Sequence, residues 1–75
     1  MTTITIHVTQ PGRRAGEILT GVADQLGTPF TRLDRDHGSF SVNAPPRRAY
    51  ADVRSAFDAV SKDWYFYFVI NRPDG

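Results

Sequence analysis

Two histidines are the side chains in this sequence best suited to proton transfer, and each stands two positions before a hydroxyl. His7 precedes Thr9 and His37 precedes Ser39, so both triplets read His-x-Thr/Ser. Imidazole exchanges a proton near neutral pH, which suits it to general acid or general base chemistry when the geometry is right. The ends of the elements that carry the two triplets are expected at the same end of one sheet.

The paired triplets resemble the motifs of the 2H phosphoesterases. That resemblance implies that His7 and His37 act as acid and base, and that Thr9 and Ser39 hold a phosphate. The chain is much shorter than that two-lobed family and matches nothing else of it. We therefore predict no enzymatic activity and no cofactor, and keep a minimal His-dependent phosphoesterase as the third hypothesis. A metal is not expected either, because the histidines and their neighbouring aspartates lack a defined ligand spacing.

Two Arg-Arg steps, Arg13-Arg14 and Arg47-Arg48, are the second chemically distinctive feature. Each is expected at a helix N-terminus, where a cation opposes the helix dipole at a cost of about 0.3 to 1 kcal/mol. A bound phosphate or an acidic side chain would offset this cost, so the four arginines are candidate anion-binding residues. The alternative is that they are solvated at loop ends, where charges contribute little. The expected topology places the two pairs at opposite ends of the domain.

The composition limits the chain to one small domain. It has 75 residues, no Cys and a formal net charge of +1, with eight Arg and one Lys. Without disulfides or thiolate zinc sites, association is the obvious remaining way to stabilise a thin core. The net charge is too small to demand a polyanionic partner. No signal peptide and no membrane-length apolar run is visible, so we expect a cytoplasmic protein without membrane contact.

Hydrophobic periodicity predicts the elements that position these residues. Residues 3–9 alternate as a half-buried strand, and apolar residues at helical spacing run from Arg13 to a stop at Gly27. Pro45-Pro46 can open a second helix, in which apolar residues repeat from Ala49 to Val60. Between the helices, residues 30–35 and 39–43 are expected to form a hairpin that turns at residues 36–38. In its first strand Thr31 and Leu33 would face inward. Gly16 and Gly21 in the first helix are expected to allow close packing against the sheet.

The order βαββαβ predicts a ferredoxin-like fold of the α+β class. This is a two-layer sandwich in which two helices cover one face of a four-stranded antiparallel sheet with strand order 4-1-3-2. A simpler meander is the competing topology. The domain is expected to cover residues 1–71, with residues 72–75 as a C-terminal tail.

The last predicted strand, residues 64–70, is the most unusual segment. Its seven residues are all apolar or aromatic, and the topology places it at the edge of the sheet. Alternation would turn Trp64, Phe66 and Phe68 toward the core. Such an edge is an aggregation hazard unless something covers it, which implies a partner.

We therefore predict a small, non-catalytic binding or regulatory module that acts through protein association, as a homodimer or with another protein. The interface would use this last strand or the open sheet face, and its expected residues are Tyr65, Tyr67, Val69, Thr5 and His7. The alternative is a nucleic-acid or phosphate-binding protein that uses the Arg pairs and the exposed tyrosines.

Overall fold

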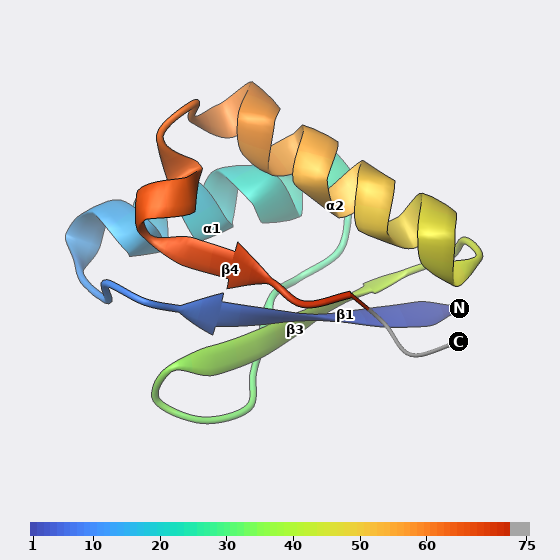
Figure 1. Cartoon of the computed structure of the whole chain (residues 1–75), viewed down its shortest axis with the longest axis horizontal. Helices are drawn as coiled ribbons and strands as arrows, with labels where there is room; N and C mark the ends of the chain where they lie inside the picture. Colours follow the sequence, from blue (N-terminus) through green and yellow to red (C-terminus); the bar gives the residue numbers. More distant parts are fainter. Residues whose placement is uncertain (73–75) are drawn as a thin grey trace.

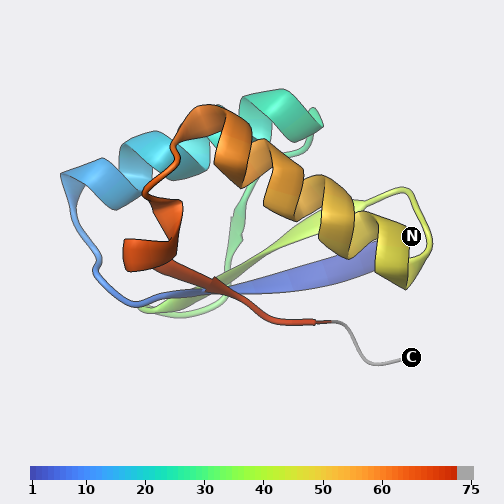
Figure 2. The ribbon, with the colours of Figure 1, turned by 45° about the horizontal axis from the view of Figure 1, so that its top comes forward.

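The computed structural model of the chain describes residues 1–72, and these form a sheet covered on one face by two helices (Figures 1 and 2). In chain order the elements are β1 (Thr2–Val8), α1 (Arg13–Leu26), β2 (Thr31–Arg32), β3 (His37–Val42), α2 (Pro46–Val60), the 3₁₀ turn η1 (Trp64–Phe66) and β4 (Phe68–Ile70). All strand pairs are antiparallel, in the order β2-β3-β1-β4. The predicted ferredoxin-like fold and its strand order are confirmed. Of the predicted tail, only Arg72 lies within the described residues.

The core lies between the sheet and the helices, and β1 runs through its centre. Ile4, Ile6 and Val8 of β1 are buried, as their alternation predicted. The ring of Phe57 on α2 lies 5.1 Å from that of Phe68 and 6.3 Å from that of Phe40, which joins the helix layer to β4 and β3. Within residues 1–72, no helix has the length and apolar character needed to cross a membrane.

The ends of the helices follow the sequence signals. Gly27 adopts the left-handed conformation (φ 68°), and its N–H donates to the carbonyl of Ala23 at 2.9 Å. Glycine adopts this conformation without a steric penalty, so it ends α1 where predicted. α2 begins at Pro46. Proline is favoured at this position because its fixed φ suits a helix and the first residue of a helix needs no N–H donor.

The first strand of the hairpin differs from the prediction. β2 has only two residues, Thr31 is exposed, and Leu33 is 60% exposed instead of facing the core. Phe30 takes the inner position, with its ring 5.1 Å from that of Phe40. It lies directly over Gly38, where a Cβ atom would come within 1.9 Å of the ring. The missing side chain at Gly38 therefore makes the space that Phe30 fills.

The hairpin turn also lies earlier than predicted, because His37 and Gly38 belong to β3. The N–H of Leu33 donates to the carbonyl of His37 at 3.0 Å and closes the turn. The carboxylate of Asp34 accepts the N–H groups of Asp36 (2.9 Å) and His37 (2.8 Å). Aspartate often stabilises turns in this way, by accepting hydrogen bonds from the backbone that follows it.

The last strand is the largest departure from the sequence prediction. Residues 64–66 form η1, so β4 has only three residues, and Phe66 is exposed rather than in the core. Trp64 is buried, and its indole N–H donates to the carboxylate of Asp58 on α2. The N–H of Phe66 donates to the carbonyl of Asp63 at 3.1 Å. The first bond holds the chain beside α2, and the second closes the 3₁₀ turn that delays the start of the strand.

The expected role of the helix glycines is also wrong. A Cβ atom at Gly16 would meet nothing within 4 Å. At Gly21 it would lie 2.8 Å from a methyl carbon of Val60, on α2. Gly21 therefore allows α1 to approach α2, not the sheet.

Candidate functional site

The open face of the sheet carries a row of three side chains across β3, β1 and β4. His7 on β1 pairs with His37 on one side and with Val69 on the other. Paired residues of adjacent strands point to the same face, and Ile6 and Val8 beside His7 point into the core. The two imidazole rings stack almost in parallel, with their centroids 4.5 Å apart and an interplanar angle of 9°. The fold therefore brings the two sequence-predicted histidines into direct contact.

Asp34 fixes the orientation of one ring of this pair. Its Oδ1 atom lies 3.0 Å from Nδ1 of His37 and also accepts the two backbone N–H groups of the turn. The hydrogen bond from the backbone of Asp36, followed by that from the His37 ring, lowers the pKa of the Asp34 carboxyl below its usual value. An ionised carboxylate only accepts hydrogen bonds, so Nδ1 of His37 carries a proton. In the neutral imidazole, Nε2 then carries the free lone pair.

The hydroxyls of the two triplets have other surroundings. The Thr9 hydroxyl donates to the carbonyl of Phe66 at 3.3 Å, and so connects the end of β1 to η1. Ser39 is buried, between Thr5 and Thr31 in the register of the sheet. The structure thus brings the histidines together, whereas the Thr9 hydroxyl is bonded within the fold and Ser39 is buried.

The outer side of β4 is an open sheet edge (Figure 1). On the side that faces β1, the N–H of Asn71 donates to the carbonyl of Thr5 at 2.9 Å. On the same side the carbonyl of Tyr67 accepts the N–H of Thr9 at 2.8 Å. Backbone groups of an antiparallel strand alternate between its two sides, so those of Phe68 and Ile70 point away from β1. These groups are free to pair with another strand.

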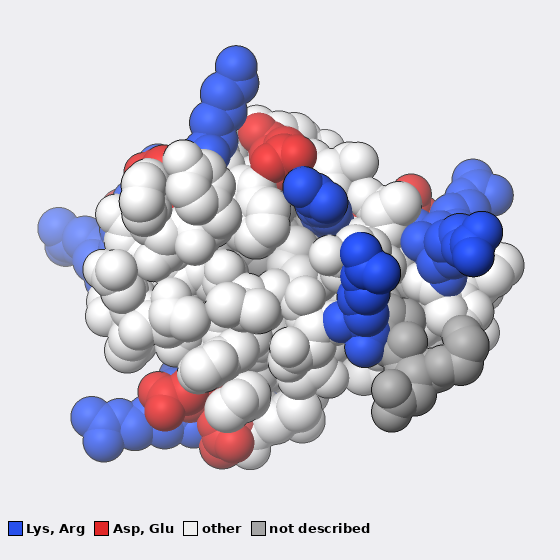
Figure 3. Space-filling view, viewed as in Figure 1, with Lys and Arg blue, Asp and Glu red and all other residues white. Residues whose placement is uncertain are grey.

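Exposed apolar side chains accompany this edge. Tyr65 is 60% exposed, Phe66 57% and Val69 47%, and the rings of Tyr65 and Phe66 lie 4.5 Å apart. We call these three residues the β4 edge patch. Figure 3 shows no Lys, Arg, Asp or Glu over η1 and β4; charged side chains lie at the margins of this view and, as basic residues, right of its centre, toward the side where β4 ends. The surface at the open edge is therefore uncharged and partly aromatic.

The predicted interface residues do not all have equal access to solvent. Tyr65 and Val69 are exposed, and Thr5 and His7 are partly exposed on the open face. Tyr67 is half-buried and packs against the core, so it offers less surface than expected. Sequence reasoning missed Phe66, since strand alternation places it inside. Only the turn at η1 brings it out, and the aromatic run gives no signal for that turn.

The two Arg pairs stand at opposite ends of the molecule, where α1 and α2 begin (Figure 1). Arg14 donates to the Ser61 hydroxyl at 2.9 Å and lies 3.6 Å from the carboxylate of Asp63 and 3.8 Å from that of Glu17. The hydrogen bond from Ser61, with the charge of Arg14 as a further cause, lowers the pKa of Asp63. An acidic partner within the chain thus offsets the helix-end charge of Arg14.

The other three candidate arginines, Arg13, Arg47 and Arg48, are exposed. Within residues 1–72 they make no hydrogen bond or ion pair through their side chains. One of them lies at the start of α1 and the other two at the start of α2. The described residues therefore place no compact cluster of free arginines at one spot.

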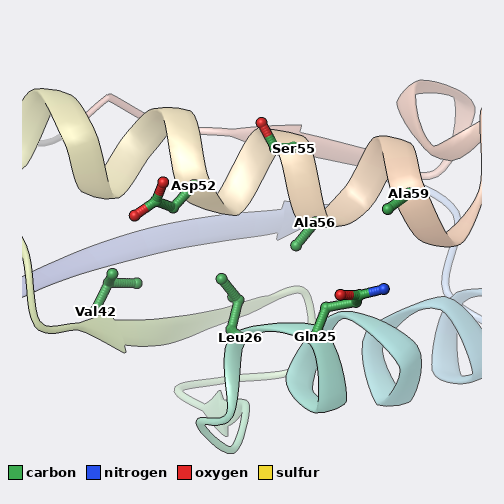
Figure 4. A pocket seen from close by; sticks show the side chains of 7 residues that line it. All are labelled: Gln25, Leu26, Val42, Asp52, Ser55, Ala56 and Ala59. Atoms are coloured by element: carbon green, nitrogen blue, oxygen red, sulfur yellow. The ribbon is translucent and has the colours of Figure 1, made fainter.

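A pocket of about 460 Å³ lies between α1, α2 and the end of β3 (Figure 4). It is lined by Gln25, Leu26, Val42, Asp52, Ser55, Ala56 and Ala59. Its volume is in the range of ligand sites, but Asp52 is its only ionisable group, and a binding site needs several converging polar groups. Across residues 1–72 no group of three or more His, Asp or Glu side chains is placed to hold a metal ion.

The open face and the β4 edge are thus the surfaces with the most unusual chemistry. The chain matches no protein-family model, no curated protein and no solved structure.

Proposed function

We propose that this chain is a protein-association module that forms a homodimer through the β4 edge. The observation that carries the proposal is an open sheet edge whose exposed side chains, Tyr65, Phe66 and Val69, are uncharged and apolar. Large apolar side chains beside unpaired strand backbone favour the addition of another strand.

A second copy fits this edge by symmetry. An antiparallel pair of β4 strands related by a twofold axis would bring the outward backbone groups of Phe68 against those of Ile70 in the other copy. Val69 of each copy would then meet at the axis on the open face. The product is one continuous eight-stranded sheet with all four helices on the same side.

The area required is available. A specific interface of about 1,000 Å² draws about 500 Å² from each copy, roughly a tenth of the chain's exposed surface of 4874 Å². β4 alone is too short for this area, so Tyr65 and Phe66, which lie just before the strand, would supply much of the rest. Aromatic side chains contribute strongly to interfaces because they bury a large area with few rotatable bonds.

The absence of charge over η1 and β4 favours a second copy over a partner of another kind. A charged edge would select a partner of opposite charge. An uncharged strand that can pair with a copy of itself requires no complementary charge. Association also benefits a chain without cysteine, whose core is small.

The test is sedimentation velocity from low to high micromolar concentration. We expect the wild type to dimerise over this range and Val69→Lys to remain monomeric, because two lysines would face each other at the twofold axis. Thr3→Lys is the matched control. Thr3→Lys places the same charge on the same open face of the sheet, but on β1 and outside the residues that pair with β4. This variant should dimerise as the wild type does.

The melting temperature gives a second reading. For the wild type it should rise with protein concentration, since dimerisation stabilises the folded state by mass action, and for Val69→Lys it should not. A wild type that stays monomeric at high micromolar concentration, or equal behaviour of the two lysine variants, would refute the homodimer.

A further inference from the structure

The stacked histidine pair has a geometry that the proposed association does not use. His7 and His37 are cross-strand partners on two adjacent strands, and β1 is paired on both sides. Both rings are partly exposed, and the side chain of His37 is 40% exposed. Within residues 1–72, neither ring nitrogen of His7 makes a hydrogen bond. The pair therefore presents nitrogen atoms from a rigid platform to solvent.

The contact with Asp34 prepares His37 as a ligand. With Nδ1–H donated to the carboxylate at 3.0 Å, the neutral ring keeps its lone pair on Nε2. Metal-binding histidines commonly donate their second ring nitrogen to a carboxylate in this way, which fixes the tautomer and makes the ligand more basic. Asp34 is itself held by the backbone N–H groups of Asp36 and His37.

We propose that His7 and His37 form a two-ligand site for a divalent transition-metal ion of the Cu²⁺, Ni²⁺ and Zn²⁺ group, with Asp34 as a positioning residue. Imidazole is a preferred ligand of these ions, whereas Mg²⁺ and Ca²⁺ take oxygen ligands. A metal lies about 2.1 Å from each nitrogen, so the two nitrogens must come within roughly 3 to 3.5 Å of each other. In the nearly parallel stack, with centroids 4.5 Å apart, the in-plane lone pairs do not converge, so binding of one ion would require the rings to rotate out of the stack about their side-chain bonds.

The site would be open and exchangeable. Since no third His, Asp or Glu in residues 1–72 completes the set, water or an external ligand would occupy the remaining positions. Such a site stands apart from the zinc centres that hold small domains together, which have four protein ligands. The proposal is also independent of the homodimer, because neither histidine lies in the β4 edge patch.

The test is a titration of the full chain with Zn²⁺ alone, followed by NMR of the histidine rings and the backbone amides. We expect saturation at one ion per chain, with the largest shifts at His7, His37 and their strand neighbours. His7→Gln and His37→Gln should each lose this binding. Asp34→Asn should bind about 10- to 100-fold more weakly. Thr5→Ala, on the same face of β1, is the control and should bind as the wild type does.

Calorimetry with Cu²⁺, Ni²⁺ and Zn²⁺ should give the tightest binding for Cu²⁺, and acid should weaken all three because protons compete for the nitrogens. Added Zn²⁺ should raise the melting temperature of the wild type but not that of His7→Gln. Undiminished binding by either glutamine variant, or shifts centred outside the pair, would overturn the site. Undiminished binding by Asp34→Asn would overturn its positioning role.

Discussion

Gly38 is the residue on which the packing of the hairpin depends most directly. A Cβ atom there would lie 1.9 Å from the ring of Phe30, and this ring is held between Gly38 and Phe40. We expect Gly38→Ala to lower the free energy of unfolding by about 1 to 3 kcal/mol, the usual cost of overpacking. Urea unfolding followed by circular dichroism measures the change.

Gly16→Ala is the matched control for this substitution. A Cβ atom at Gly16 meets nothing within 4 Å, and alanine favours the helix over glycine by up to about 1 kcal/mol. The control should therefore stabilise the fold. If Gly38→Ala also stabilised it, the position assigned to Phe30 would be wrong.

Asp34 gives the turn a pH-dependent contribution to stability. Its carboxyl pKa is lower in the folded chain than its ordinary value of about 3.9. The stabilisation is therefore fully present above that value and is lost as the pH falls through the folded pKa. We expect Asp34→Ala to melt at a lower temperature than the wild type at pH 7, with a difference that shrinks below about pH 4.

Asp36→Ala is the control for this pH series, because it removes the same charge from the same turn. Within residues 1–72 the Asp36 side chain makes no hydrogen bond. Thermal melts of both variants between pH 7 and pH 2.5 compare them. A melting difference for Asp34→Ala that stayed constant down to the lowest pH would contradict the assigned role.

Residue types alone predicted much of the core but not every inward position. The alternation of Ile4, Ile6 and Val8 was decisive because a half-buried strand has a period of two. The prediction for Leu33 was wrong because Phe30 occupies the inward position in its place. Phe30 fits there only because Gly38 has no side chain. A contact between residues 30 and 38 is tertiary, so a local pattern does not reveal it.

At the scale of elements, the boundary between η1 and β4 can be tested by comparing the stability of two phenylalanine variants. Phe68 is buried and Phe66 is exposed, although continuous alternation would make them equivalent. We expect Phe68→Ala to reduce the free energy of unfolding by about 3 to 5 kcal/mol. Phe66→Ala should change it by no more than about 0.5 kcal/mol.

The two phenylalanine variants should be compared by chemical denaturation at low protein concentration. This keeps any effect of Phe66 on self-association out of the measurement. Similar losses of stability in both variants would show that the strand starts before Phe68 and that η1 is misassigned.

The helices were more predictable than the last strand for a physical reason. Both carry apolar residues at helical spacing and end or begin at Gly27 and Pro46, which restrict the backbone. Residues 64–70 are apolar throughout, so no periodicity separates turn from strand. The bonds of Trp64 to Asp58 and of Phe66 to Asp63 determine the boundary, and the first of them forms only when α2 is in place.

At the scale of the whole molecule, the topology predicted which strand ends would lie at the same end of the sheet, but not which residues would be in contact. The strand order brings His7 and the hairpin turn to the same end, as expected from the sequence. Direct stacking requires the register that pairs His7 with His37, and this register depends on a turn at residues 33–36. Moving the turn by one residue would put the second histidine on the other face.

The distribution of the arginines is also a property of the whole molecule. Connections in this fold make α1 and α2 begin at opposite ends of the sheet, so Arg13 and the pair Arg47-Arg48 are separated. The candidate arginines therefore do not converge on one anion-binding site.

The place of β1 in the sheet has a consequence for how the protein is made. β1 is made before its neighbour β4, and residues 9–67 separate the two strands in the chain. At about 5 to 20 residues per second, synthesis of that intervening segment takes roughly 3 to 12 s. During this time one side of β1 lacks its native neighbour. The sheet can be completed only after β4 has been made, and until then the exposed side of β1 is open to chaperones and to other nascent chains.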